Sequence, residues 1–192
     1  MSAAETREEI LAASAALFAE RGIAGTTMRA IAERCSIRAA SLYHHFAAKA
    51  DIVAEIMTRS SAHAVGLYAE IVGAGLAPGA RVEALMRATL QNFREHPEAA
   101  RMFYENSEYV ATAPLLHQVR TEARANDRLW VQAIDEARAA GDLRSDIDPV
   151  RMKVLLRNMM LSIYRDIDSN RIGDVADDVV TILLHGVLVT ER

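Results

Sequence analysis

Side chains suited to bind a nucleic-acid backbone gather in one short segment of the chain. A phenol, an imidazole and an ammonium group occur close together as Tyr43, His44 and Lys49. All three can bind phosphate oxygens, through hydrogen bonds or through charge. Two hydroxyls precede them at Thr26 and Thr27, where a helix could begin and direct its free backbone N–H groups at a phosphate. The chemistry that this segment predicts is binding to DNA.

Other residues of the same segment could contact base edges. Arg29 lies one turn inside the helix that begins at Thr26 or Thr27, within reach of a base or a phosphate. Arg38, Ala39 and Ser41 begin the next helix and would face the bases. We therefore expect base contacts from this part of the segment.

Two short helices joined by a turn would position these groups. The first buries Met28, Ile31 and Ala32, and the turn falls at Ser36 and Ile37. The second helix covers about residues 38 to 46. This is the outline of a helix-turn-helix, in which one helix braces a second that enters the DNA major groove.

An apolar face anchors the second of these helices. Leu42 and Phe46 are four residues apart and so share one face. They are expected to pack against Ile10, Phe18 and Ile31. Tyr43, His44 and Lys49 would then point outward.

The charge distribution supports the same interpretation. The whole chain carries a net charge of −4, but residues 26–50 contain four Lys and Arg against one Glu, so the remainder carries −7. A basic patch on an acidic body can bind phosphates while the body keeps the molecule soluble.

The segment FAERGIAGTTMRAIAERCSIRAASLYHHFAAKADI resembles the N-terminal module of the tetracycline-repressor (TetR) family of transcriptional regulators. The resemblance covers about residues 6 to 55 and rests on the spacing of Phe18, Gly22 and Thr27, the IAE sequence, and LYHHF followed by Lys49. It implies an all-α homodimer with an N-terminal helix-turn-helix and a C-terminal helical domain for dimerisation and effector binding. It also implies phosphate contacts from Thr27, Tyr43 and Lys49, and base contacts near Arg29, Arg38, Ala39, Ser41 and His44.

The chain departs from the family pattern at two positions. Ser36 stands in the turn where the family usually has glycine, and a positive φ there would cost a serine about 1 kcal/mol. Arg38 stands where the recognition helix usually opens with a small polar cap. The preferred base sequence therefore does not transfer from relatives.

The rest of the chain is predicted to be helical. Ala, Leu, Met, Arg and Glu dominate, with nine Gly and four Pro. The first helix should begin near Thr6, as the N-cap of a capping box with Glu9, and end at Arg21 and Gly22. Further helices are expected at about 48–72, 79–95, 98–110, 113–140, 148–168 and 174–190. We expect a DNA-binding domain over 1–47 and an effector-binding and dimerisation domain over 48–192.

The last two helices are apolar around most of their circumference. The final one carries seven aliphatic side chains: Val179, Val180, Ile182, Leu183, Leu184, Val187 and Leu188. A helix of this kind at a chain end is most easily buried against both its own domain and a partner. Two such helices per subunit predict a four-helix homodimer interface; the alternative is an ordinary internal core.

Soft and aromatic side chains of the second domain could line an apolar effector cavity. The candidates are Met86, Phe93, Met102, Phe103, Tyr104, Trp130, Arg157, Met160 and Tyr164. Arg157 lies among apolar neighbours and needs a partner, either a carboxylate such as Glu108 or Asp166 or an anionic ligand group. The run from Trp130 to Arg165 is similar to a branch of the same family that senses acyl-CoA thioesters of lipid or steroid breakdown.

Several function classes find no support. Ser/His/Asp signatures, phosphate loops and dinucleotide-binding glycine patterns are missing, so we expect no enzyme and no cofactor. His44 and His45 point about 100° apart on a helix and cannot share a metal ion. The single Cys35 excludes an internal disulfide, and we expect a cytoplasmic protein without a signal peptide or membrane span.

The sequence thus predicts a homodimeric repressor that binds double-stranded operator DNA and is released by a small-molecule effector. Two alternatives remain open at this point. One is a helical small-molecule-binding protein whose DNA module is vestigial. The other is a transcriptional activator of the same fold.

Overall fold

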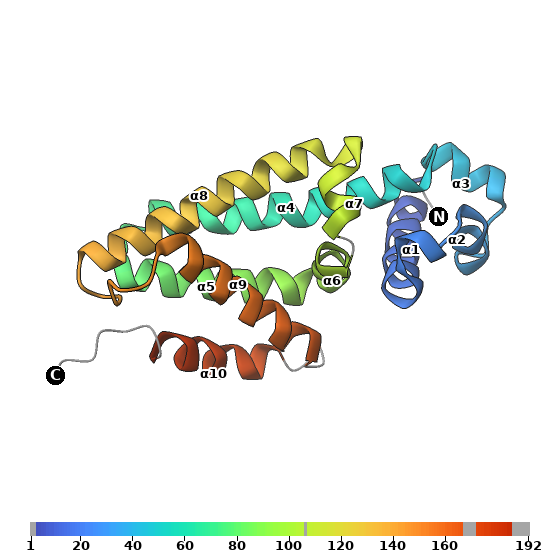
Figure 1. Ribbon diagram of the computed structural model, residues 1–192. Coiled ribbons are helices and arrows are strands. Elements are labelled where there is room, and N and C mark those ends of the chain that lie inside the picture. The colour runs from blue at the N-terminus through green and yellow to red at the C-terminus, as the bar shows by residue number, and fades with distance from the viewer. Residues whose placement is uncertain (1–2, 106, 167–171, 186–192) are drawn as a thin grey trace. The chain divides into compact units, whose positions relative to one another are not determined.

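The computed structural model describes the backbone of residues 3–105, 107–166 and 172–185, and the side chains of 5–102, 109, 111–162 and 176–184. The described chain is helical, with no strand in these ranges (Figure 1). The elements are α1 (Ala3–Gly25), α2 (Met28–Arg34), α3 (Ala39–His45), α4 (Lys49–Gly73), α5 (Pro78–Glu95), α6 (Pro97–Glu105), α7 (Ser107–Thr112), the 3₁₀ helix η1 (Pro114–Leu116), α8 (His117–Ala139), α9 (Pro149–Asp166) and α10 (Ile172–His185).

The predicted helices are confirmed within the described residues, with differences at their ends. Residues 167–168 and 186–190 of the last two predicted helices lie outside the described residues. Proline begins α5, α6 and α9, because its fixed φ suits the first turn of a helix and its missing N–H leaves no bond unmade. The single helix expected over 98–110 is described as α6 and α7. The helix expected from 113 begins with the short η1 before α8.

The first helix begins earlier than predicted. Because α1 starts at Ala3, Thr6 lies inside the helix and the expected N-cap there is wrong. The expected end at Gly22 is confirmed as a kink, since Gly22 has φ 73° and ψ 165° between two helical stretches. Only glycine adopts this backbone conformation without strain.

The chain forms two compact units. The first comprises Met1–Ser60 and Glu98–Arg120, and the second Ser61–Pro97 and Thr121–Arg192. Both α4 and α8 contribute residues to each unit. This division by packing differs from the functional boundary that we predicted near residue 47.

The first unit contains the helix-turn-helix. α2 packs against both α1 and α3 (Figure 1). Ser36 forms the turn with φ 55°, as expected from its place between the two helices. The core beneath joins Ile10, Phe18 and Ile31 to Leu42 and Phe46, so the predicted anchoring of α3 is confirmed. Met28 is half-buried rather than buried.

The second unit has its own core. α5 packs against α9 and α10 (Figure 1). Leu85, Met86, Ile134 and Val82 are fully buried at the centre of this cluster. On α10, Val179, Val180 and Leu183 are buried, whereas Ile182 is 70% exposed. Val187 and Leu188 lie outside the described residues.

Candidate nucleic-acid interface

The second helix of the motif, α3, presents two different faces. Leu42 is 0% exposed and Phe46 is 3% exposed on the buried face. Tyr43 is 54% exposed and His44 is also exposed, as predicted. At the start of the helix, Arg38 and Ala39 are exposed and Ser41 is half-buried.

The first turn of α3 has no side-chain cap. Arg38 occupies the N-cap position with extended backbone angles and makes no capping hydrogen bond. The free backbone N–H groups at this end therefore have no acceptor from the cap residue. Arg38 makes no ion pair within the described part of the chain.

Thr27 is the N-cap of α2. Its Oγ1 accepts a hydrogen bond of 3.2 Å from the backbone N–H of Ala30. Thr27 remains exposed, so its hydroxyl proton can still be donated outward. Of the two threonines that we considered as caps, Thr27 is the one that caps α2.

Thr26 does not face a phosphate, and this part of the prediction is wrong. The residue is 0% exposed, and its hydroxyl lies 2.9 Å from the carbonyl oxygen of Gly22 and 3.2 Å from that of Leu17. These contacts tie Thr26 to the kink at Gly22 and to the turn of α1 before it. Thr26 therefore holds the connection between α1 and α2 against α1 through its buried hydroxyl.

The predicted outward orientation of Lys49 is also wrong. Its Nζ donates to the carbonyl oxygens of Ile23 (2.5 Å) and Thr26 (2.6 Å), and the residue is half-buried. Burial lowers the pKa of the ammonium group. A cation at the carboxyl end of a helix also interacts favourably with the helix dipole.

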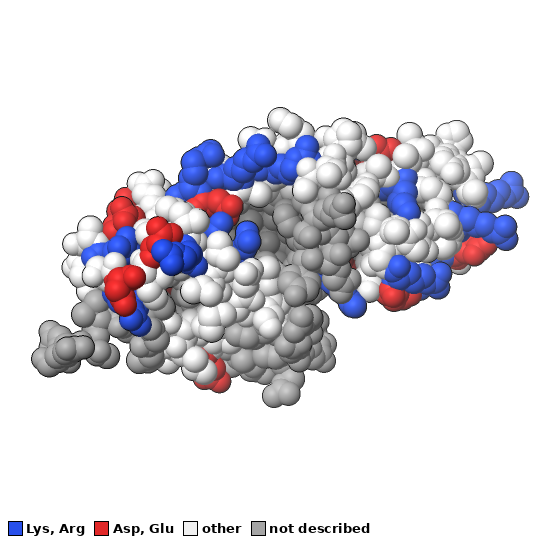
Figure 2. All heavy atoms as spheres, in the orientation of Figure 1, with Lys and Arg blue, Asp and Glu red and all other residues white. Residues whose placement is uncertain are grey.

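The basic segment is less positive at its surface than its composition suggests. Arg29 pairs with Glu33 at 2.8 Å, and Arg34 pairs with Glu20 at 2.8 Å. Figure 2 shows acidic atoms directly beside basic ones in this region. Because Lys49 is turned inward, Arg38 is the exposed cation of residues 26–50 that lacks an ion pair among the described residues.

Arg7, which no sequence pattern singled out, contacts the end of α3. Its Nη1 donates to the carbonyl oxygen of His45 at 2.7 Å, and its guanidinium carbon lies 4.1 Å from the centroid of the Phe46 ring. Arg7 also pairs with Glu55 of α4 at 2.5 Å. No periodic pattern links residues so far apart in sequence, so no local signal could have found this contact.

The predicted effector residues do not form one lining. Met86, Trp130 and Met160 are buried in the core of the second unit, and Phe93 is partly buried against it. Met102 is buried in the core of the first unit. The side chains of Phe103, Tyr104 and Tyr164 lie outside those described. Most of the described members of this set are therefore core residues, divided between the two units, and their role as effector contacts stays a prediction.

The buried cation near the start of α9 is Lys153 and not Arg157. Lys153 has a side chain only 8% exposed, and its Nζ lies 2.6 Å from Oδ1 of Asp127. Arg157 is 49% exposed and lies 4.0 Å from the same carboxylate. Asp127 was not among its expected partners, and the side chains of Glu108 and Asp166 lie outside those described. An exposed Arg157 does not need a buried partner.

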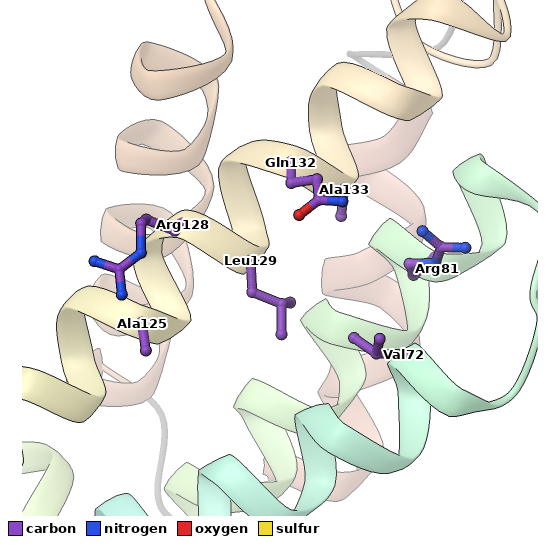
Figure 3. Close-up of a pocket in the computed structure, with 7 residues that line it drawn as sticks. All are labelled: Val72, Arg81, Ala125, Arg128, Leu129, Gln132 and Ala133. Atoms are coloured by element: carbon purple, nitrogen blue, oxygen red, sulfur yellow. The ribbon is translucent and has the colours of Figure 1, made fainter.

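A pocket of about 270 Å³ opens on the surface of the second unit (Figure 3). Val72, Leu129 and two alanines give it an apolar floor, while Arg81 and Arg128 supply guanidinium groups. Arg81 pairs with Glu136, whereas Arg128 is exposed and makes no ion pair among the described residues. None of the predicted effector residues lines this pocket, which is formed by Val72, Arg81, Ala125, Arg128, Leu129, Gln132 and Ala133.

Comparison with known proteins agrees with this architecture. Residues 10–56 match the family model of bacterial regulatory proteins, tetR family, and residues 75–187 match that of the tetracyclin repressor-like C-terminal domain. The HTH-type transcriptional repressor KstR2 of Rhodococcus jostii (strain RHA1) is 32% identical over 186 residues, which cover 94% of this chain and 90% of that protein. The chain belongs to the tetR family of transcriptional regulators.

Solved structures of tetR-family regulators share the fold. The structure of the ketosteroid transcriptional regulator KstR2 of Mycobacterium tuberculosis matches with a TM-score of 0.90 and 26% identity, covering 96% of this chain and 95% of that one. AibR, in complex with isovaleryl coenzyme A and operator DNA, matches with a TM-score of 0.78 and 22% identity over 93% of this chain and 98% of that one. At that identity, AibR supports the fold alone. Within the described ranges, no helix has both the length and the apolar character needed to cross a bilayer.

Proposed function

We propose that this tetR-family regulator is a homodimeric repressor that binds a near-palindromic operator and is released by a small-molecule effector. The observation that carries the proposal is α3, whose Leu42 and Phe46 are buried while Tyr43 and His44 face solvent. Each α3 would enter a major groove, with the two helices about 34–36 Å apart. Tyr43, Thr27 and Lys49 would contact phosphates, and Arg29, Arg38, Ala39, Ser41 and His44 would lie near the bases.

The test is fluorescence anisotropy with short duplexes that tile the DNA upstream of the protein's own gene. At least one duplex should bind more tightly than random DNA by about a thousandfold or more. Tyr43→Ala should weaken binding, because it removes an exposed phenol from α3. Arg144→Ala is the control, since Arg144 is exposed in the second unit and its one ion pair among the described residues is with Asp146. Equal binding to every duplex would contradict the proposal.

Lys49 has a narrower role in this proposal than its sequence position suggested. An ammonium group carries three N–H donors, and two of them are directed at carbonyl oxygens of the first unit. The third can bind a phosphate that approaches the end of α1. Lys49→Met should therefore lower both the stability of the first unit and its affinity for DNA, measured by thermal unfolding and by anisotropy.

Exposed apolar side chains on α9 and α10 support the homodimer. Val150 is 52% exposed, Leu155 55%, Met159 46% and Ile182 70%. A second copy would remove these side chains from water. Leu155→Glu should convert the dimer to a monomer in light scattering and weaken operator binding. Val65→Glu, on α4 and 38% exposed, is the control and should leave the dimer intact.

The effector we propose is an acyl-CoA thioester, or another anion with an apolar body. Arg124 and Arg128 are exposed on α8 and make no ion pair within the described part of the chain. Figure 2 shows a row of basic side chains over this helix. Guanidinium groups bind phosphates, and the apolar floor of the pocket suits an aliphatic chain. The effector would act by binding more tightly to a subunit arrangement that does not fit the operator.

A panel of acyl-CoA thioesters tests the effector class, with free coenzyme A and the free acids as separate arms. Release of DNA by a thioester alone supports the proposal, and release by none of them contradicts it. Saturable ligand binding without any DNA binding would favour the small-molecule-binding alternative. In vitro transcription then separates a repressor from an activator.

A further inference from the structure

The end of the recognition helix is held by one arginine from the first helix of the chain. Arg7 donates from Nη1 to the carbonyl oxygen of His45, the last residue of α3. Its guanidinium group also lies over the ring of Phe46, which follows α3 as its C-cap. Arg7 thus contacts two consecutive residues where α3 ends, through a hydrogen bond and a cation–π contact.

The other side of the Arg7 guanidinium group is fixed to α4. Its Nη2 lies 2.5 Å from Oε2 of Glu55, and its Nε lies 3.4 Å from Oε1. Glu55 also pairs with Arg59 at 2.7 Å, and Arg59 pairs with Glu8 through both of its terminal nitrogens. The four side chains form one ion network that joins α1 to α4.

Within this network, the Arg7–Glu55 pair is better shielded than the outer pair. The side chains of Arg7 and Glu55 are 38% and 23% exposed, whereas those of Arg59 and Glu8 are 44% and 61% exposed. Ion pairs with less solvent between them are less weakened by screening. Arg7 and Glu55 are therefore the stronger part of the network. Among the described residues, Arg7 is also the one member of the four that contacts the end of α3.

We propose that Arg7 is a positioning residue for operator recognition, which sets the orientation of α3 against α1 and α4. This inference rests on the proposed function of α3 as the helix that reads DNA. α3 has only seven residues and no side-chain cap at its start, so its own stability is small. Its orientation must come from the tertiary contacts of Leu42 and Phe46 and from the bond that Arg7 makes to its end.

Only arginine can make these contacts together. Its planar group can donate to a carbonyl, pair with a carboxylate and stack on a ring at the same time, which the point charge of lysine cannot do. When Arg7 is lost, α3 should remain helical but adopt a wider range of orientations. Base contacts require a fixed orientation, whereas attraction to the phosphates does not.

The test compares Arg7→Met with Arg59→Met. Both variants remove one positive charge from the same network, but Arg59→Met leaves both contacts with α3 in place. The readout is the ratio of affinity for the tightest upstream duplex to affinity for random DNA of equal length. Arg7→Met should lower this ratio by about tenfold, and Arg59→Met should change it by less than about twofold.

A second readout needs no DNA. The backbone N–H of Phe46 donates to the carbonyl oxygen of Leu42 at 3.0 Å, and so reports on the end of α3. Its hydrogen exchange should be faster by about tenfold in Arg7→Met and unchanged in Arg59→Met. Arg7→Lys should lie between wild type and Arg7→Met in both readouts, and it replaces Arg7→Met if that variant does not fold.

The outcomes separate this inference from the proposed function. An unchanged affinity ratio with unchanged exchange at Phe46 overturns the role of Arg7. Equal losses of affinity for the specific duplex and for random DNA also overturn this role, because they indicate a smaller folded fraction of the protein. If wild type binds no duplex preferentially, the proposed function fails, and the exchange of Phe46 still decides whether Arg7 orders α3.

Discussion

The hydroxyl oxygen of Tyr68 lies 2.7 Å from Oγ1 of Thr89. Tyr68 belongs to α4 and Thr89 to α5, and they are 7% and 6% exposed. Oγ1 of Thr89 donates to the carbonyl oxygen of Leu85 at 2.8 Å, so the proton between the two hydroxyls comes from Tyr68. The ring of Tyr68 also meets that of Trp130 edge to face, at 6.5 Å between centroids. The core of the second unit therefore contains a hydrogen-bonded chain between α4 and α5, beside an aromatic contact with α8.

Tyr68→Phe should lower the free energy of unfolding by about 1 kcal/mol, because Oγ1 of Thr89 loses its buried donor while the packing of the ring is kept. Urea unfolding followed by circular dichroism measures the difference. The control is Tyr43→Phe, at an exposed ring, which should change the free energy by less than about 0.5 kcal/mol. Similar values for both variants would contradict the assignment of the Tyr68 hydroxyl as a buried donor.

Stability should also fall in alkali because of Tyr68. Burial raises the pKa of its phenol above the usual value. Because this pKa is higher in the folded state than in the unfolded state, the neutral phenol stabilises the fold. That stabilisation is complete below about pH 10 and is lost as the pH rises toward the folded-state pKa. Between about pH 10 and that value, the midpoint of thermal unfolding should fall less in Tyr68→Phe than in wild type. An identical pH dependence in the two proteins would contradict this prediction.

Two buried hydroxyls of the first unit should have opposite effects on the free energy of unfolding when they are removed. Ser14 and Thr26 are both 0% exposed, but Oγ of Ser14 has no hydrogen-bond partner among the described residues. Ser14→Ala should leave the free energy of unfolding unchanged or raise it by up to about 1 kcal/mol. Thr26→Val keeps the shape but loses the bonds to Leu17 and Gly22, and should lower it by about 1–2 kcal/mol. Chemical denaturation measures both free energies of unfolding. A decrease in Ser14→Ala as large as that in Thr26→Val would be inconsistent with these contacts.

The turn of the helix-turn-helix contains strain that glycine would relieve. Ser36 has φ 55°, which is unfavourable for a residue with a Cβ atom. Ser36→Gly should raise the free energy of unfolding by as much as about 1 kcal/mol, less the greater entropy of glycine in the unfolded chain. Ser36→Val is the comparison and should be destabilising, because a β-branched residue fits this backbone region least well. Thermal unfolding of wild type and the two variants gives the order of their stabilities.

Local patterns were sufficient to predict most of the helices and the anchoring of α3. The spacing of Leu42 and Phe46 determines which side of a short helix is buried, and proline and glycine mark the ends of helices. The same patterns could not separate Thr26 from Thr27, because both can cap a helix and only the path of α1 decides which one is enclosed.

Contacts between distant parts of the chain lay beyond these patterns. The inward turn of Lys49 depends on the carbonyl oxygens of Ile23 and Thr26, near the end of α1 and more than twenty residues earlier. The contact of Arg7 with His45 and Glu55 depends on how three helices meet. Methionine and aromatic residues suggested a cavity, but the same side chains also fill cores, and composition alone does not distinguish the two roles.

Trp130 is the single tryptophan of the chain, and its place in the core of the second unit makes it an optical reporter of that unit alone. Its emission should shift to longer wavelength only when that core opens to water. Helical circular dichroism reports on both units together. Heating followed by these two signals would therefore show whether the DNA-reading half of the molecule melts independently of the other half.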